Sequence, residues 1–416
     1  MHGDIKLVLN INLRSDRAAV EEKWSHRADL AESAIHDRHA SSVWSLPRTN
    51  LAVVSWPPVT KERLFVHWHY WWQAHYVDCQ VDAASRHNTK TRRKRIADTL
   101  RGIRRRNLTA LTKNRYYDDK LWLALAMDRV AKLPKMSRPK GLTLLQNNIL
   151  DGRDETFGIL PWREGETFLN VPTNGPAAIM LARMGRIDEA RHIIDWIYDH
   201  LVDDDGFIMD GLRMRMDGPE LVRNIHPYCQ GVVLGACLEI ALALRDEAGV
   251  GSLEQIDSVR DAELADETMR YLTRIRGLVQ AVASDMATPA GVIDWDTGDG
   301  DGGLFKGILV RYLADVAVRL PADSPANRAT RKLAARLVIA SANSVWEHRL
   351  EVDGLPIFGT DWTADARLPH NYGVGASTIG EKVGVIRIAE RDLSVQLSGW
   401  MLLEAAARVA KSLERS

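Results

Sequence analysis

Long helices that lack a polar face are the feature that most restricts the fold of this chain. Residues 64–83, 121–131 and 231–244 are apolar on nearly every side when they are read with the period of an α-helix. Residues 186–201 and 328–350 instead carry one polar and one apolar face. A helix without a wet face has to be enclosed by other helices, whereas an amphipathic helix suits an outer layer. The alternation of the two kinds along the chain predicts an inner ring of helices inside an outer ring.

Helical patterning extends over most of the 416 residues. The predicted helices are residues 17–40, 62–86, 90–106, 119–133, 138–150, 174–184, 186–202, 228–248, 263–286, 302–319, 325–350 and 391–413. Only residues 5–13, IKLVLNINL, alternate like a strand. No linker rich in Ser, Gly or Pro divides the chain, so we predict a single all-α domain over residues 1–416, with a short N-terminal extension at residues 1–15.

Charge and cysteine content limit the class of protein. Lys plus Arg and Asp plus Glu both number 55, so the formal net charge is zero and gives no general electrostatic reason to expect a nucleic-acid partner. Cys79, Cys229 and Cys237 are an odd number in apolar surroundings, which indicates buried thiols in a reducing compartment. The first residues lack the pattern of a secretory signal, and no apolar stretch reaches the length of a membrane span. We expect a cytoplasmic protein, or an exported one if translation starts upstream.

Two aspartates, Asp118 and Asp119, stand together in the stretch RYYDDKLWLALAMDRV, directly before an enclosed helix. In one interpretation they serve the helix alone, with Asp118 as its N-cap and Asp119 favoured by the helix dipole. In the other they are a catalytic pair. Glycoside hydrolysis with retention of configuration needs two carboxyl groups about 5 to 5.5 Å apart, one ionised as nucleophile and one protonated as acid. The spacing leaves both interpretations open.

Polar residues also recur where other enclosed helices begin, and in a ring of helices these positions could surround one cavity. Trp162 lies in a long loop, and it or one of Trp71 and Trp72 could stack on the C–H face of a sugar. Further residues of this kind are Asn174, Asp210, Tyr228, Gln230, Lys306 and Arg311.

Five segments in this order resemble glycoside hydrolase family 76, the endo-α-1,6-mannanases, over roughly residues 60–350. They are the Tyr-Asp-Asp before a W.ALA helix at 117–126, the tryptophan loop leading to NGPAAIMLARMG, the Asp-Gly turn at 210–211, the Y.QG helix start at 228–231, and FKGILVRYL at 305–313. The resemblance implies an (α/α)6 barrel and a retaining α-1,6-mannanase that needs no cofactor and no metal. It departs from the family pattern at Cys229, where relatives often have asparagine, and beyond residue 351.

Carried over by position, the resemblance gives Asp118 the role of nucleophile and Asp119 that of acid/base. The substrate-binding residues that we expect are Tyr117, Trp162, Asn174, Asp210, Tyr228, Gln230, Lys306 and Arg311. The implied substrate is an α-mannan oligosaccharide or a mannosylated glycolipid, bound by a monomer.

Other functions stay open at this point. A transglycosylase acting on a mannosylated glycolipid would use the same residues and differ only in the acceptor. A non-catalytic α-mannan-binding protein would not need both carboxylates. A sugar epimerase on a similar barrel would place histidines at several helix starts, where only His226 fits.

Residues 86–107 hold ten Lys or Arg against the single acid Asp98. A solvated helix face explains such a run. The alternative is a patch for phosphates, either on nucleic acid or on lipid headgroups, which would include a weak contact of helix 90–106 with an anionic membrane. No nucleic acid is expected. The acids at 294, 296, 299 and 301 miss the spacing of a calcium-binding EF-hand loop, so we expect no metal there.

Overall fold

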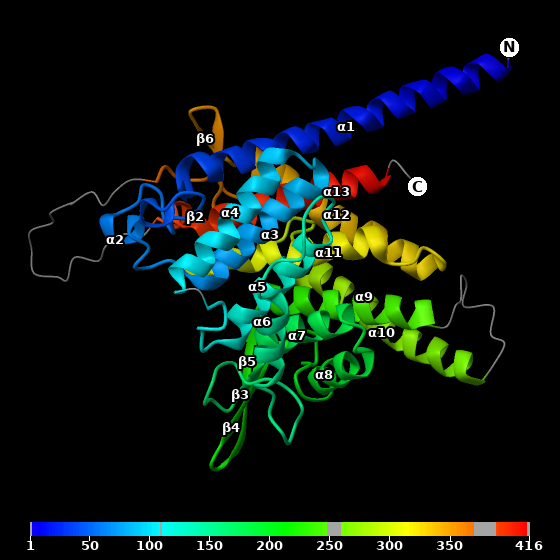
Figure 1. The fold of residues 1–416 in the computed structure, drawn as a ribbon. Helices are drawn as coiled ribbons and strands as arrows, with labels where there is room; N and C mark the ends of the chain where they lie inside the picture. Colours follow the sequence, from blue (N-terminus) through cyan, green and yellow to red (C-terminus); the bar gives the residue numbers. More distant parts are fainter. Residues whose placement is uncertain (1, 109, 248–258, 370–387, 414–416) are drawn as a thin grey trace, which may run out of the picture.

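The computed structural model describes residues 2–108, 110–247, 259–369 and 388–413, and six inner helices form a closed ring within these residues. Figure 1 shows the helices in their order along the chain. Each inner helix contacts the next, and the last contacts the first. The inner helices are α3 (Tyr70–Arg86), α5 (Tyr117–Ala131), α7 (Val171–Arg183), α9 (Pro227–Glu247), α11 (Phe305–Arg319) and α13 (Leu393–Leu413). The outer helices that pack on them are α4 (Lys90–Arg106), α6 (Leu142–Leu150), α8 (Ile187–His200), α10 (Val259–Asp285), α12 (Pro325–Glu347) and α1 (His2–His39). The predicted (α/α)6 barrel is confirmed.

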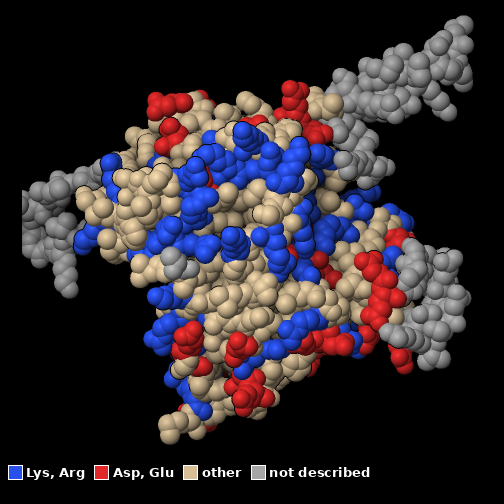
Figure 2. All heavy atoms as spheres, in the orientation of Figure 1, with Lys and Arg blue, Asp and Glu red and all other residues tan. Residues whose placement is uncertain are grey.

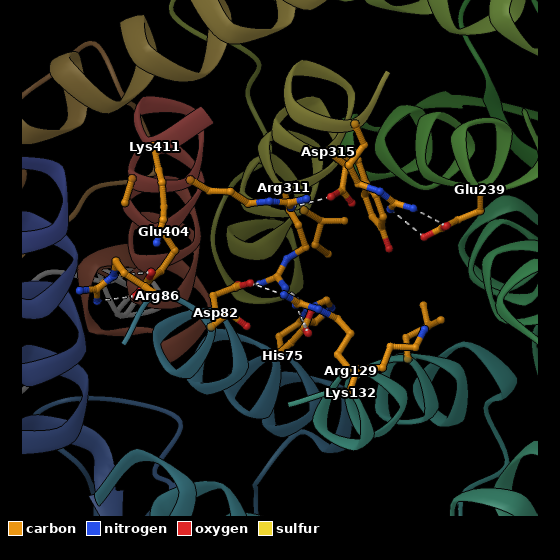
Figure 3. A pocket seen from close by; sticks show the side chains of 18 of the residues that line it. His75, Asp82, Arg86, Arg129, Lys132, Glu239, Arg311, Asp315, Glu404 and Lys411 are labelled. Atoms are coloured by element: carbon orange, nitrogen blue, oxygen red, sulfur yellow. Dashed lines mark hydrogen bonds and ion pairs between the residues drawn. The ribbon is translucent and has the colours of Figure 1, made fainter. Parts of the chain in front are cut away.

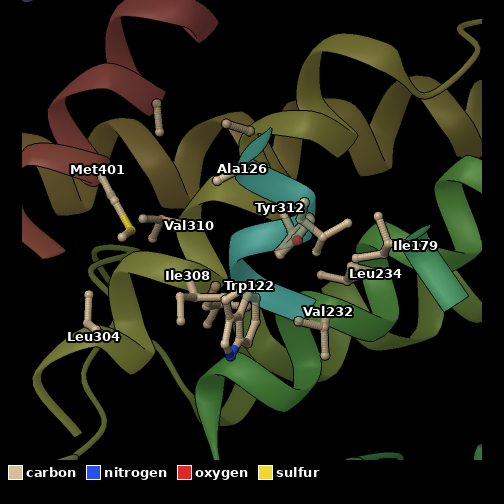
Figure 4. Close-up of a cluster of buried hydrophobic side chains, with 14 of the residues drawn as sticks. Trp122, Ala126, Ile179, Val232, Leu234, Leu304, Ile308, Val310, Tyr312 and Met401 are labelled. Carbon is tan, nitrogen blue, oxygen red and sulfur yellow. The ribbon is translucent and has the colours of Figure 1, made fainter. Parts of the chain in front are cut away.

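The core lies between the inner helices, because these are the helices without a polar face. Figure 4 shows Trp122 of α5, Ile179 of α7, Leu234 of α9 and Ile308 of α11 converging in one buried cluster. Glycine lets neighbouring inner helices approach each other closely: a Cβ on Gly307 would stand 2.7 Å from the Cα of Ser398 on α13. Packing of this kind joins the ring into one apolar core.

Helix α9 is the one helix within the described ranges that is long and apolar enough to cross a membrane, with a mean hydropathy of 1.5. It is an inner helix, and 78% of that apolar window is buried inside the barrel. Enclosure by the other helices therefore accounts for its composition. Cys79, Cys229 and Cys237 are buried free thiols, as predicted.

Short antiparallel strands connect the helices at the rim of the barrel. The largest sheet has the order β3-β4-β5, formed by Phe168–Asn170, Met209–Arg215 and Gly218–Ile225. Strand β3 runs directly into α7, so the sheet fixes where this inner helix begins. The two smaller sheets pair β1 (Ala40–Ser41) with β2 (Leu51–Ala52) and β6 (Leu350–Val352) with β7 (Leu355–Ile357).

Two predictions about the N-terminal third are wrong. The alternating residues 5–13 are not a strand, because α1 runs without interruption through them and through residues 1–15, apart from Met1, which lies outside the described residues. Residues packed against α13 support the helix, and extending an existing helix is much easier than starting one. The predicted helix 62–86 is interrupted: α2 covers Thr60–Arg63, and α3 begins only at Tyr70. Phe65 and His69 between them have positive φ angles of 53° and 42°, which a helix does not allow.

Candidate active site

The paired aspartates occupy the first turn of inner helix α5. Tyr116 is the N-cap residue, so Asp118 does not have the capping position that one interpretation gave it. Asp118 accepts a hydrogen bond from the backbone N–H of Asp119 at 2.9 Å and one from the Trp162 indole at 3.0 Å. Asp119 accepts a hydrogen bond from the Asn114 amide at 2.6 Å. Both carboxyl groups are half-buried, and both lie where the partial positive charge of a helix N-terminus favours anions.

The surroundings change the acidity of both groups. Burial raises the pKa of Asp118 well above its usual range, and the charge of Asp119 adds to the rise, while the N–H donors of Asp119 and Trp162 oppose it. Burial also raises the pKa of Asp119, to about 7; the Asn114 amide lowers it and the charge of Asp301 raises it. Because the two carboxylates repel each other, ionisation of one carboxyl group disfavours ionisation of the other.

Trp162 is fixed by the backbone on both sides of its loop. Its carbonyl accepts a hydrogen bond from the N–H of Tyr117, and its own N–H donates to the carbonyl of Phe168 at the start of β3. The indole also packs edge-on against Tyr116, with ring centroids 5.1 Å apart. The loop is thereby tied to both α5 and the sheet, which directs the indole N–H at Asp118.

A third carboxylate, that of Asp301, lies at the same end of the barrel as Asp118 and Asp119. Asp301 precedes α11 and accepts hydrogen bonds from the indoles of Trp71 and Trp72, at 2.9 and 2.8 Å. The His69 ring stacks on Trp72, with centroids 4.2 Å apart. The charge of Asp301 reaches Asp119, so the start of α3, the start of α5 and the loop before α11 meet at one end of the barrel. We name this the catalytic end. Sequence reasoning missed Asp301 as a functional residue, since it weighed this loop only as a calcium site.

Tyr228 and Phe305 form an aromatic platform at the same end. Their rings are stacked with centroids 3.9 Å apart and an angle of 6° between the planes. Burial raises the pKa of the Tyr228 hydroxyl, and the charges of Asp210, Asp118 and Asp301 add to the rise, which places all three carboxylates around this side chain. Burial raises the pKa of Asp210 to about 6, against the nearby charge of Arg213. The structure therefore brings Asp118, Asp119, Trp162, Asp210 and Tyr228 together, as the sequence prediction expects.

Asn174 and Gln230 have fully buried side chains that bind backbone groups. The Asn174 amide bonds both the N–H and the carbonyl of Leu160, at 2.9 and 2.8 Å. The Gln230 amide does the same with Ile208, at 2.9 and 2.8 Å. This geometry favours a role in holding the Trp162 loop and the Asp210 strand, and it does not support the predicted sugar contact for either residue.

Tyr117 and Lys306 also have partners other than a ligand. The Tyr117 ring is buried against Gly152 and carries the Lys120 ammonium over its face at 4.1 Å, behind the aspartate pair. Lys306 donates a hydrogen bond to the carbonyl of Thr360 at 2.5 Å, and burial lowers its pKa to about 8. This geometry gives no support to a sugar contact for Tyr117. For Lys306 it favours a structural role, in which the ammonium holds the segment around Thr360 in place.

Arg311 lies away from the catalytic end, which corrects its predicted placement. It forms ion pairs with Asp78 and Asp82 of α3 in a cavity of about 610 Å³ at the opposite end of the inner helices (Figure 3). The residue is two turns into α11, so its side chain emerges at a different depth from that of Phe305. We name this the far cavity.

Fold and site together define a class of protein. An (α/α)6 barrel with paired, partly buried carboxyl groups beside aromatic faces is the arrangement of a glycoside-cleaving enzyme. The profile of glycosyl hydrolase family 76 matches residues 53–383, and the chain belongs to this family. The protein is thus a glycoside hydrolase, and the predicted family is confirmed.

Solved structures agree with this assignment. The chain is similar to the GH76A alpha-1,6-mannanase from Salegentibacter sp. HEL1_6, with 25% identity over 93% of this chain and 99% of that chain and a TM-score of 0.71. An inactive variant of the same enzyme, with two adjacent aspartates changed to asparagine, is in complex with alpha-1,6-mannotriose and has 24% identity, coverage of 93% and 99%, and a TM-score of 0.71. The Lin0763 protein from Listeria innocua has 24% identity, coverage of 92% and 97%, and a TM-score of 0.70. No curated protein sequence matches the chain.

Proposed function

We propose that the protein cleaves α-1,6-mannosidic linkages of mannan-type glycans by a retaining double displacement. The observation that carries this proposal is the pair Asp118 and Asp119 at the start of α5, with different hydrogen-bond partners on each carboxyl group. The similar Salegentibacter mannanase has two adjacent aspartates whose replacement gives its inactive variant, and that variant holds alpha-1,6-mannotriose. The adjacent aspartates are the shared feature that supports the same substrate class here.

The surroundings assign one role to each aspartate. Two N–H donors point at Asp118, and hydrogen bonds to a carboxylate favour its charged form. Asp119 faces the negative charge of Asp301, which favours its protonated form. Burial raises the pKa of both groups, and the charge of Asp119 also raises that of Asp118. Because two N–H donors point at Asp118, we nevertheless place the proton on Asp119, with Asp118 as the ionised nucleophile.

Two steps follow from these roles. In the first, the Asp118 carboxylate bonds to the anomeric carbon while the bond to the departing O6 breaks and Asp119 gives that oxygen its proton. In the second, Asp119 takes a proton from water, and the resulting hydroxide displaces Asp118 from the anomeric carbon. Two inversions return the α configuration. Trp162 and the Tyr228–Phe305 platform offer the aromatic faces on which the sugar would stack.

Linear α-1,6-mannan oligosaccharides test the activity directly. Proton NMR spectra recorded during their hydrolysis should show that the shorter mannosides are released first as the α anomer. Release of the β anomer would overturn the retaining mechanism, and binding without cleavage would overturn the hydrolase. Products longer than the starting material would indicate transglycosylation.

Azide separates the two aspartates. With an activated aryl α-1,6-mannobioside, Asp118→Gly should give a β-mannosyl azide, because azide replaces the nucleophile and inverts the anomeric carbon once. Asp119→Gly should give an α-mannosyl azide, because azide then attacks the covalent intermediate. Asp119→Asn should lower kcat/KM on unactivated mannan by about 10²- to 10⁴-fold. If Asp118→Gly gave the α-mannosyl azide and Asp119→Gly the β-mannosyl azide, Asp119 would be the nucleophile and Asp118 the acid/base.

The monomeric state and the cytoplasmic location stay predictions, which sedimentation and cell fractionation can test. Contact of helix 90–106 with an anionic membrane is also a prediction at this point.

A further inference from the structure

Helix α4 presents an unusually basic face to solvent. Its buried side carries no cation: Ile96, Thr99 and Ile103 are fully buried, and the acid Asp98 is buried beside them. Some of the nine cations on α4 contribute to packing: Arg92 and Arg95 form ion pairs with Glu32 of α1. The cations that point outward are Lys90, Arg93, Lys94, Arg101, Arg104 and Arg105.

These outward cations are only weakly neutralised. Asp98 pairs with Lys94 at 2.6 Å and with Arg101 at 2.8 Å. No carboxylate pairs with Lys90, Arg104 or Arg105 in the part of the chain that the structure describes. Figure 2 shows the Lys and Arg side chains gathered over the region that α4 occupies in Figure 1. The net charge of the whole chain, which is zero, hides this local excess.

Large apolar side chains are exposed beside the end of the same helix. Leu64, Val66 and Leu108 are 52%, 55% and 67% exposed. The exposed apolar residues that we name the apolar ridge are Trp44, Leu46, Leu64, Val66 and Leu108. A group of this kind at the surface of a soluble protein marks a contact site more often than chance.

Arg106, the last residue of α4, ties the ridge to the helix. Its guanidinium lies over the Trp44 ring at 5.8 Å and donates to the carbonyl of Phe65 at 2.6 Å. The Trp44 indole in turn donates to the carbonyl of Leu64 at 2.9 Å. Trp44 and Phe65 both have positive φ angles, 47° and 53°, which cost energy in residues of this size. The loops are therefore held in a conformation that leaves their apolar side chains in solvent.

A groove continues the same combination along α4. It has a volume of about 430 Å³ and lies between α4 and residues 136–140. Leu100, Met127 and Met136 belong to its apolar lining, and its basic residues are Arg101, Arg104, Arg105 and Lys140. Apolar surface bordered by cations thus recurs on this side of the molecule.

We propose that the basic face of α4 and the apolar ridge bind the surface of an anionic lipid bilayer. The cations would lie against lipid phosphates, and the ridge would enter the headgroup region. The phosphates of a nucleic acid would also attract the cations, but a nucleic acid offers no apolar phase for exposed Leu and Val side chains. Charge and apolarity together therefore select the bilayer.

The position of the ridge gives this contact a consequence for the enzyme, one that rests on the proposed function. The loop that holds Leu64 and Val66 leads through His69 into Trp71 and Trp72, the indoles that bind Asp301. A bilayer bound at the ridge would lie beside the catalytic end. Mannosylated glycolipid anchored in that bilayer is then the substrate class that the surface favours.

Vesicle co-sedimentation of the full chain tests the contact without any substrate. We expect binding to phosphatidylcholine vesicles that contain phosphatidylglycerol, weakened by salt, and little binding to pure phosphatidylcholine. Arg104→Glu with Arg105→Glu should weaken binding by about tenfold or more. Leu64→Ser with Val66→Ser should weaken it several-fold and leave the salt dependence intact.

Matched controls exclude a general charge or folding effect. Arg328→Glu with Lys332→Glu makes the same charge change on exposed positions of α12 and should leave vesicle binding unchanged. All three double variants should keep the wild-type rate on soluble α-1,6-mannan oligosaccharides.

Three outcomes would overturn the proposal. The first is that the chain does not bind vesicles that contain phosphatidylglycerol, and the second is that the α12 control loses as much vesicle binding as the Arg104 and Arg105 variant. The third comes from an RNA-binding assay of the same proteins: the Arg104 and Arg105 variant loses RNA binding and keeps its vesicle binding. Because the sedimentation contains no glycan, a failed mannanase assay would leave this result standing.

Discussion

At the scale of single residues, neighbouring atoms give two identical side chains different properties. Asp118 receives an indole N–H and a backbone N–H, and Asp119 receives the Asn114 amide and faces Asp301. Each of these contacts can be removed separately, so the assignment of the two roles can be tested one contact at a time.

Trp162→Phe keeps an aromatic ring and removes one donor from Asp118. Hydrogen bonding to the carboxylate lowers its pKa, so its loss should raise the pKa of Asp118 and move the acidic limb of the kcat/KM profile to higher pH. A charged hydrogen bond of this kind corresponds to about 10- to 100-fold in kcat at the optimum. A uniform loss of activity with an unmoved acidic limb would mean that Trp162 only stacks on the sugar.

Asp301→Asn removes a charge that raises the pKa of Asp119. The pKa of Asp119 should therefore fall, and the alkaline limb of the profile, where the acid loses its proton, should move to lower pH. Asp296→Asn is a control from the same loop, since that carboxylate accepts from the N–H of Gly298 at 3.0 Å. Equal shifts in both variants would contradict a specific effect of Asp301 on Asp119.

Sequence patterns predicted the position of some residues at the catalytic end but not the hydrogen-bond partners of others, for a physical reason. Asp118, Asp119 and Tyr228 could be found because each stands at the start of an enclosed helix. Asn174 and Gln230 stand at similar positions, but their amides bond buried backbone groups, and a sequence does not distinguish an amide that binds backbone from one that binds sugar. The role of Asp301 depends on two indoles about 230 positions away.

At the scale of secondary-structure elements, the helices were predictable and their interruptions were not. Local periodicity is strong in a helix that is enclosed or amphipathic, and the helix 90–106 agrees with α4 at both ends. The break before α3 depends on contacts of Phe65 and Trp68 with Arg106, which are remote in sequence. Strand β3 pairs with β4, about 40 residues further along the chain, and short strands carry little local signal.

Close contact between inner helices predicts which glycines the barrel needs. A Cβ on Gly307 would stand 2.6 Å from the Ser398 hydroxyl and 2.7 Å from the Ser398 Cα, so α11 and α13 would have to separate. Gly307→Ala should lower the free energy of unfolding by about 1–3 kcal/mol in urea titrations.

Gly277 on α10 provides the matched control, because a Cβ there would meet nothing within 4 Å. Gly277→Ala should raise the free energy of unfolding by about 0.5–1 kcal/mol, since alanine favours the helix. Equal effects of the two substitutions would show that inner-helix spacing does not limit stability.

At the scale of the whole molecule, the two ends of the barrel differ in how their charges are arranged. The catalytic end collects the N-termini of the inner helices, where carboxylates are favoured, and its acids Asp118 and Asp301 accept hydrogen bonds from the neutral indoles of Trp162, Trp71 and Trp72. The far cavity pairs its acids with arginines from other inner helices, such as Asp315 of α11 with Arg408 of α13 at 2.5 Å. The catalytic end is thus suited to proton transfer, and the ion pairs of the far cavity hold the inner helices together.

The far cavity should therefore make stability depend on pH. Although burial alone would raise the pKa of Asp315, Arg408, Arg319 and Arg183 lower it to about 2. A depressed native pKa contributes stability above the unfolded pKa, and this contribution is lost as the pH falls towards 2. Asp315→Asn should lower the free energy of unfolding by about 2 kcal/mol at pH 7 and by progressively less between pH 4 and pH 2.

Urea titrations of wild type and Asp315→Asn across that pH range measure the difference directly. Arg408→Gln in the Asp315→Asn background should cost less than Arg408→Gln alone, because the ion pair is already broken. The free energies of unfolding of wild type and Asp315→Asn could differ by an amount that does not change with pH. Asp315 would then stabilise the barrel by packing, and the other ion pairs of the far cavity would hold the inner helices together. A difference that disappears at low pH, together with non-additive double-variant energies, would assign the closure between α11 and α13 to this pair of charges.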